Sequence, residues 1–234
     1  MRKNSGFTLI ELLAVIIVLV LLGLIVYPAI EKTIKNTRDD LSKSQVTSIE
    51  NAARNWIADN PYSIPKNNGD ELVISLCQLK IGSYIDQKLI NPKTDKMYDC
   101  KTKIIVKNEN NRYNYTVDFS DTVEENVPSN LSYPSVKIDD DYLVYIKKSD
   151  IYKEPTLTIN DTEVFTLIDA NSGIFTSNNE NSDYEVKVVY NNNEQGIDTN
   201  TVGSNLITYS IIDKSNNITT TVYRNVIVVN EWFV

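Results

Sequence analysis

The chain contains no histidine, and only 7 of its 234 residues are glycine. Without histidine there can be no Ser-His-Asp or Cys-His catalytic arrangement and no histidine-ligated metal site. The glycines are scattered, so no glycine-rich loop is available to hold a phosphate. Paired carboxylates occur only in turn-like runs, which gives no support to glycosidase chemistry. The sequence therefore predicts a protein that is not an enzyme and that needs no cofactor and no metal.

Cysteine is also scarce, because Cys77 and Cys100 are the two in the chain. In an exported domain the oxidising compartment favours one disulfide between them. Two unpaired, buried thiols are the alternative. A pair of cysteines without histidine cannot complete an ordinary four-ligand zinc site.

Positive charge is sparse toward the end of the chain, where residues 151–234 carry 11 acidic and 4 basic side chains. Such a region repels the phosphates of nucleic acid and anionic membrane surfaces, so nucleic acid is not an expected partner. A locally basic run between Lys93 and Arg112 leaves two interpretations open. It is either a solvated face or a weak patch for DNA or a protein partner.

The strongest feature is a long apolar run near the N-terminus, which has no charge over the 16 residues from Leu12 to Tyr27. Residues 7–27 are long enough to cross a membrane as a helix. A secretory signal peptide would need a small-residue cleavage site after the run, and the sequence offers none there. Neither a signal peptide nor a plain anchor explains Glu11, because a carboxylate within such a run costs about 2.5 kcal/mol or more.

The stretch GFTLIELLAVIIVLVLL, preceded by a short basic leader, resembles the N-terminus of the type IV pilin family, which includes the pseudopilins. The resemblance implies that prepilin peptidase removes leader 1–6 by cleaving between Gly6 and Phe7, and that Phe7 is then N-methylated. It also implies that Glu11 is an assembly residue, whose carboxylate neutralises the Phe7 amine of a neighbouring subunit. A glutamate snorkelling to the membrane face is the alternative. Pro28 matches a proline common in the long helix of the family.

The long helix is expected to cover residues 7–60, with residues 7–27 as its transmembrane part. After the apolar run, apolar residues recur at spacings near 3, 4 and 7, which indicates a helix with one apolar stripe. Asp59, Asn60 and Pro61 mark its end. The stripe consists of Ile30, Ile34, Leu41, Ile49, Ala52, Ala53, Trp56 and Ile57.

The stretch DELVISLCQLKIGSYIDQKLINPKTDKMYDC resembles the head segment of Gram-positive-type pseudopilins in the order of its elements, and residues 61–119 are predicted to form such a head. Ser75 is predicted to cap a short helix that runs to about Gly82. Alternating residues at 103–107 and 113–119 predict two strands joined by a polar loop. The resemblance implies that this hairpin packs on the long helix. A Cys77–Cys100 bridge would tie the short helix to the segment that leads into the strand at 103–107.

Residues 120–135 are polar, contain two prolines and are predicted to be a linker. Residues 136–234 alternate as short strands at regular spacing, which favours a β-sandwich. The stretch 196–229 resembles the tail of bacterial immunoglobulin-like domains of the HYR kind, and it places the core of such a domain at about 155–230. Calcium is a further possibility at 139–141 and 169–173, where ordinary loop turns are the alternative.

Together these features predict an α+β protein with a long N-terminal helix, a small pilin-like β head and an all-β immunoglobulin-like domain. The resemblance implies a structural, minor subunit of a type IV pilus or of a secretion or competence pseudopilus. Its partners would be prepilin peptidase, other pilin subunits and membrane lipid before assembly, with an unknown ligand for the C-terminal domain. It would cross the cell membrane once and then lie outside the cytoplasm in a filament. A static, membrane-anchored surface adhesin that never enters a filament is the alternative.

Overall fold

The computed structural model describes residues 8–120, 122–123, 131–169, 174–191 and 196–230. The chain divides into two compact units, residues 1–44 and residues 45–234. A helix, an accompanying small sheet and a large β-sheet confirm the predicted α+β class. Helix α1 (Leu9–Asp59) begins in the first unit and ends in the second.

The part of α1 in the first unit is a helix whose large apolar side chains are exposed. An apolar run of this kind favours a helix because a helix satisfies the backbone polar groups within the segment. Pro28 lies inside the helix, where it removes one backbone donor, and the helical assignment continues past it. One turn later the Thr33 hydroxyl donates to the carbonyl of Ala29 at 2.9 Å. Ile30 and Ile34, the start of the predicted stripe, are about half exposed.

The second unit begins with the buried end of α1, followed by the small β head. The second half of the predicted stripe, from Ile49 to Ile57, is buried, as an apolar face packed on a sheet requires. The head sheet has the strand order β1-β4-β5, and both pairs are antiparallel. The elements are η1 (Pro61–Ser63), β1 (Glu71–Ser75), α2 (Leu76–Ile81), β2 (Ile90–Asn91), β3 (Lys96–Met97), β4 (Lys103–Glu109) and β5 (Arg112–Asp118).

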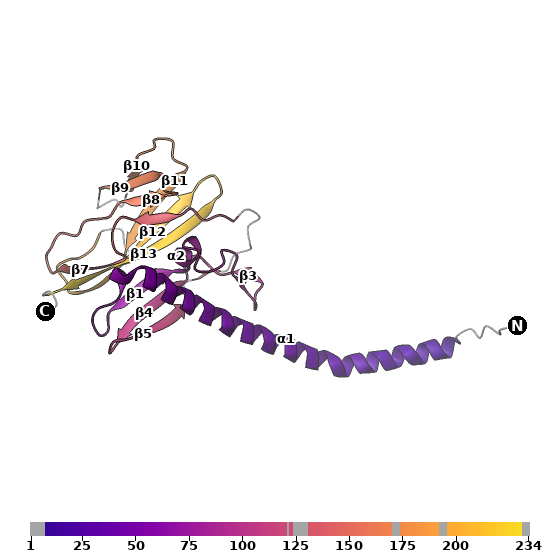
Figure 1. The fold of residues 1–234 in the computed structure, drawn as a ribbon. Coiled ribbons are helices and arrows are strands. Elements are labelled where there is room, and N and C mark those ends of the chain that lie inside the picture. The colour runs from indigo at the N-terminus through magenta and orange to yellow at the C-terminus, as the bar shows by residue number, and fades with distance from the viewer. Residues whose placement is uncertain (1–7, 121, 124–130, 170–173, 192–195, 231–234) are drawn as a thin grey trace. The chain divides into compact units, whose positions relative to one another are not determined.

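The C-terminal region forms one eight-stranded sheet with the order β6-β8-β9-β10-β11-β12-β13-β7. Neighbouring strands are antiparallel except β13 and β7, which run parallel. Figure 1 shows the two longest strands, β12 and β13, lying side by side in orange and yellow. The strands are β6 (Val136–Ile138), β7 (Leu143–Lys147), β8 (Leu157–Ile159), β9 (Glu163–Asp169), β10 (Ile174–Ser177), β11 (Tyr184–Tyr190), β12 (Gly203–Asp213) and β13 (Ile218–Val229).

This single sheet differs from the two packed sheets expected of a sandwich. Side chains from both ends of the strand order share one apolar cluster, so the sheet must curl around its own core. Leu157 and Ile159 of β8 belong to that cluster together with Val222 and Val226 of β13, and all four are fully buried. A sheet that encloses its core by curling needs no second sheet to cover its apolar face.

The head and the C-terminal sheet share a second apolar cluster, in which Leu143, Tyr145 and Ile227 join the buried side chains of α1 and β1. Strand β1 also lies next to β13. Half of the predicted linker, residues 121 and 124–130 of 120–135, lies outside the described residues. The domain boundaries remain predictions, but the two regions that they separate are packed on each other within residues 45–234.

Candidate functional site

The N-terminal end of α1 is organised by a reciprocal contact between Thr8 and Glu11. The backbone N–H and the hydroxyl of Thr8 donate to Oε2 of Glu11 at 2.9 Å and 2.8 Å. The backbone N–H of Glu11 lies 3.4 Å from the Thr8 hydroxyl oxygen. This is a capping box, in which a threonine before the helix and a glutamate at its third position satisfy each other's backbone donors.

The sequence carried a signal for this contact, because Thr8-Leu9-Ile10-Glu11 fits the S/T-x-x-E pattern that precedes an apolar run. Sequence reasoning singled out Glu11 and missed Thr8. The structure brings Glu11 to the first turn of its own helix, where the helix dipole favours a negative charge. Gly6 and Phe7, the predicted cleavage pair, lie outside the described residues.

The rest of this segment offers an apolar surface to its surroundings. The large apolar side chains described between Leu9 and Val26 are 47% to 82% exposed. Among the described residues, α1 is the helix that is long and apolar enough to cross a membrane, and its apolar window is not buried within the chain. Exposed apolar side chains of this number need either lipid or neighbouring protein around them.

The head holds the two cysteines. Ser75 caps α2, as predicted, and Gln78 completes a capping box with it, which fixes the direction in which the short helix leaves β1. Cys77 and Cys100 form a disulfide with their Cα atoms 4.6 Å apart. The backbone N–H of Cys77 donates to the carbonyl of Cys100 at 2.9 Å, so the bridge and the backbone hold the same two segments together.

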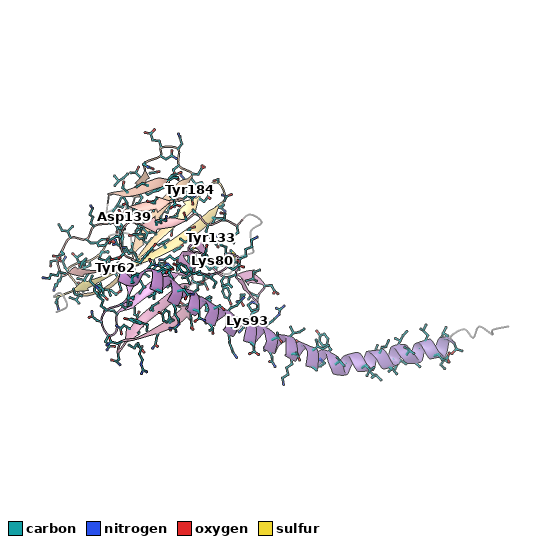
Figure 2. All side chains as sticks on the ribbon, in the orientation of Figure 1. Tyr62, Lys80, Lys93, Tyr133, Asp139 and Tyr184 are labelled. Carbon is teal, nitrogen blue, oxygen red and sulfur yellow. A yellow bond between two sulfur atoms is a disulfide. The ribbon has the colours of Figure 1, made fainter. Side chains whose placement is uncertain are left out.

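Beside the disulfide lies a buried lysine that the sequence did not single out. The Lys80 side chain is fully buried, and its Nζ donates to the carbonyl of Tyr98 at 3.2 Å. Nζ also lies 5.4 Å from the centre of the Tyr133 ring, and Figure 2 shows the two residues close together. Burial lowers the pKa of Lys80 to about 8, against the attraction of Asp99 and Asp86.

The predicted basic run is partly paired within the head. Lys107 forms an ion pair with Glu71 at 2.9 Å, across the β1–β4 pair. This pairing favours the solvated face over a nucleic-acid patch, since it lowers the positive charge of the run.

The residues considered as calcium ligands either bond to other groups of the protein or lie outside the described residues. Asp139 accepts the backbone N–H of Thr156 at 2.8 Å, and Asp140 pairs with Arg224. Residues 170–173 are outside the described residues. Among the residues that are described, no group of three or more cysteine, aspartate and glutamate side chains is placed to hold a metal ion.

A further polar cluster lies inside the C-terminal sheet, where Arg224 of β13 is fully buried. Its guanidinium donates to the carbonyl of Asp141 at 2.9 Å and to the Tyr152 hydroxyl at 2.6 Å. Near it, the Tyr209 hydroxyl donates to Oε2 of Glu154 at 2.5 Å. No sequence signal pointed to this cluster, because its members come from the loops at 139–142 and 148–156 and from the β12–β13 hairpin, which are far apart along the chain.

The comparisons with known proteins bear on the N-terminal segment. A family model described as the prokaryotic N-terminal methylation motif matches residues 1–27. The comparison with curated proteins found no match, and neither did the comparison with solved structures. The matched segment contains the capping box and most of the exposed apolar run of α1. This chain therefore has the N-terminus of a type IV pilin-like precursor.

Proposed function

We propose that this protein is a prepilin that prepilin peptidase cleaves between Gly6 and Phe7 and methylates at Phe7. After processing it assembles through α1 with other pilin subunits into a type IV pilus or a pseudopilus. The observation that carries this proposal is the match of residues 1–27 to the methylation motif, which includes Gly6, Phe7 and Glu11.

The geometry of α1 supports assembly as well as membrane insertion. Its apolar side chains are exposed all along the segment, so they can leave lipid for the packed helices of a filament core. Before assembly the Glu11 carboxylate is held by Thr8 of its own chain. In the filament it exchanges this contact for the Phe7 amine of a neighbouring subunit, since an opposite charge in a low-dielectric setting attracts it more strongly than neutral donors do.

The decisive measurement is the mass of the N-terminal peptide of the membrane-extracted protein. In cells that contain an active prepilin peptidase, we expect a chain that starts at Phe7 and carries one added methyl group. The variant Gly6→Val should retain residues 1–6, whereas the matched control Ser5→Val should be processed as the wild type is. An intact N-terminus in the wild type, with the peptidase active on another substrate, would refute the proposal.

The C-terminal sheet is proposed to be the part that a filament displays, for adhesion or for contact with a partner protein. Its role is structural and not catalytic. The relationship to immunoglobulin-like domains is part of this proposal, supported by the sequence pattern over 196–229 and by the long β12–β13 hairpin that this pattern forms.

A static membrane anchor is the second candidate, because α1 is long and apolar enough to cross a membrane without any assembly. Glu11→Ala separates the two candidates. For a filament subunit, the variant should insert and be cleaved but fail to enter filaments sheared from the cell surface. If the wild-type protein is also absent from the sheared fraction while other pilins are present, the anchor is the better description.

A further inference from the structure

Two loops of the C-terminal region, 148–151 and 196–200, line a common groove. The backbone N–H of Ser149 donates to the carbonyl of Thr199 at 2.8 Å, which joins the two loops. The groove has a volume of about 430 Å³. Sites of roughly 300 to 1,000 Å³ enclose small ligands, so this groove has room for a large side chain.

The wall of the groove is largely apolar and aromatic. Leu167 and Ile197 pack against the core of the C-terminal sheet, and Tyr152 and Tyr190 add aromatic surface. Ile151 also lines the groove and is 95% exposed, so no described residue covers its side chain. An apolar wall that is open to water is stabilised when another apolar side chain covers it.

Strand β13 ends beside this groove. The carbonyl of Val229, the last residue of the strand, accepts the backbone N–H of Lys148 at 2.8 Å. Lys148 directly precedes Ser149, which lines the groove. An extended chain advances by at most about 3.6 Å per residue, so the Cα atom of Trp232 lies within about 11 Å of that of Val229. Trp232 can therefore reach the groove.

The residues that follow β13 have the composition of a segment that packs on protein. Residues 231–234 lie outside the described residues, and their sequence is Glu-Trp-Phe-Val. Three successive large apolar side chains are unfavourable in water, and the two aromatic ones have the most surface to bury. Lys147 is paired with Val229 in the sheet, and Lys148 follows it. These two cations lie close enough to attract the carboxylate of Glu231.

The polar groups of the groove also suit a tryptophan. Asp150 and Glu154 are the charged side chains among its described lining residues. Glu154 is held by the Tyr209 hydroxyl, whereas Asp150 is exposed. The indole ring has an N–H donor and no acceptor, so Trp232 can donate to the Asp150 carboxylate while its ring covers Ile151.

We propose that residues 231–234 dock into the groove of their own chain, with Trp232 packed on Ile151. The docked segment ties the end of β13 to loops 148–151 and 196–200, and it closes the groove to other ligands. This docking needs neither cleavage after Gly6 nor a filament. It can therefore fail while the proposed function holds, and the reverse is equally true.

The test measures the surroundings of Trp232 in the full chain, purified in detergent. Trp56, the other tryptophan, is buried, and the emission of Trp232 is obtained in each variant as the difference made by Trp232→Phe. Acrylamide should quench Trp232 at least about threefold less in the native protein than in urea, because a docked ring is shielded from water. Ile151→Glu should remove this protection, since it places a charge against the indole ring.

The matched control is Ile168→Glu, which makes the same change at a 66% exposed isoleucine that does not line the groove. It should keep the protection of Trp232. A brominated detergent reports shielding by the micelle, and dilution of the protein reports docking on a second copy. The proposal is overturned if native Trp232 is quenched as readily as in urea, if the brominated detergent quenches it, if dilution exposes it, or if Ile151→Glu protects it as well as Ile168→Glu does.

Discussion

Lys80 shows how a single buried residue makes stability depend on pH. In the unfolded chain a lysine keeps its ordinary pKa of 10.5, whereas burial lowers the pKa of Lys80 to about 8 in the folded protein. Between these two values the unfolded state binds more protons than the folded state. The free energy of unfolding must therefore rise as the pH is raised from about 8 toward 10.5.

We expect this rise to be measurable by urea unfolding between pH 8 and 9.5, with a slope of at most about 1.4 kcal/mol per pH unit. The pH range ends at 9.5 because tyrosine ionisation at higher pH lowers the free energy of unfolding. Burial and Asp59, for example, raise the pKa of Tyr84 to about 12 in the folded protein. Lys80→Met should remove the rise. Lys187→Met, at a side chain that is 62% exposed, should keep it. Equal slopes in the two variants would mean that Lys80 is not the source.

At the scale of the element, the start of α1 depends on Thr8. Thr8→Val keeps the shape of the side chain but removes the hydroxyl that donates to Glu11 at 2.8 Å. Loss of such a cap typically costs about 1 kcal/mol. Amide hydrogen exchange in the first turn, measured in lipid nanodiscs, should become roughly fivefold faster, which corresponds to that energy.

Thr33→Val is the matched control for this prediction, because Thr33 lies in the interior of the same helix and donates its hydroxyl to the carbonyl of Ala29. It should leave exchange in the first turn unchanged. If Thr8→Val exchanges at the wild-type rate, the capping contact does not stabilise the helix start.

The elements that sequence reasoning predicted well are those whose signals are local. The apolar run predicts a helix from its length, and Ser75 predicts a cap because serine is a preferred N-cap residue. The structure adds Gln78 as its reciprocal partner. The capping box at Thr8 was equally local. It was missed because the high cost of a carboxylate in an apolar run predicts an oppositely charged partner, whereas the structure pairs Glu11 with a neutral threonine of the same chain.

At the scale of the whole molecule, the packing of the head on the C-terminal sheet had no signal that sequence reasoning could read. Gln78 and Tyr223 are 145 residues apart, yet the backbone N–H of Tyr223 donates to Oε1 of Gln78 at 3.0 Å. The hydroxyl of Ser75 donates to the carbonyl of Thr221. Such contacts leave no periodic pattern, so the sequence suggested two domains and a linker. The sequence did not predict that the eight-stranded sheet curls, because alternating apolar and polar residues show which face of a strand is buried but not which strands are neighbours.

These contacts predict that residues 45–234 unfold as one cooperative unit. Gln78 is buried, and its amide satisfies the backbone N–H of Ser75 and both backbone groups of Tyr223. Gln78→Leu leaves those groups unpaired, which should lower the free energy of unfolding by about 2 to 4 kcal/mol. When amide hydrogen exchange is measured in increasing urea, the amides of α1 near Trp56 and those of β12 should lose protection at the same urea concentration. This should hold in both the variant and the wild type.

The control is Asn114→Leu, a change at an exposed position of the edge strand β5. It should shift unfolding by no more than about 0.5 kcal/mol. If Gln78→Leu destabilises the head alone while β12 keeps its protection, the two regions fold independently, and a filament would carry the C-terminal sheet on a flexible connection. If protection is lost together, the sheet is held rigidly by the end of α1.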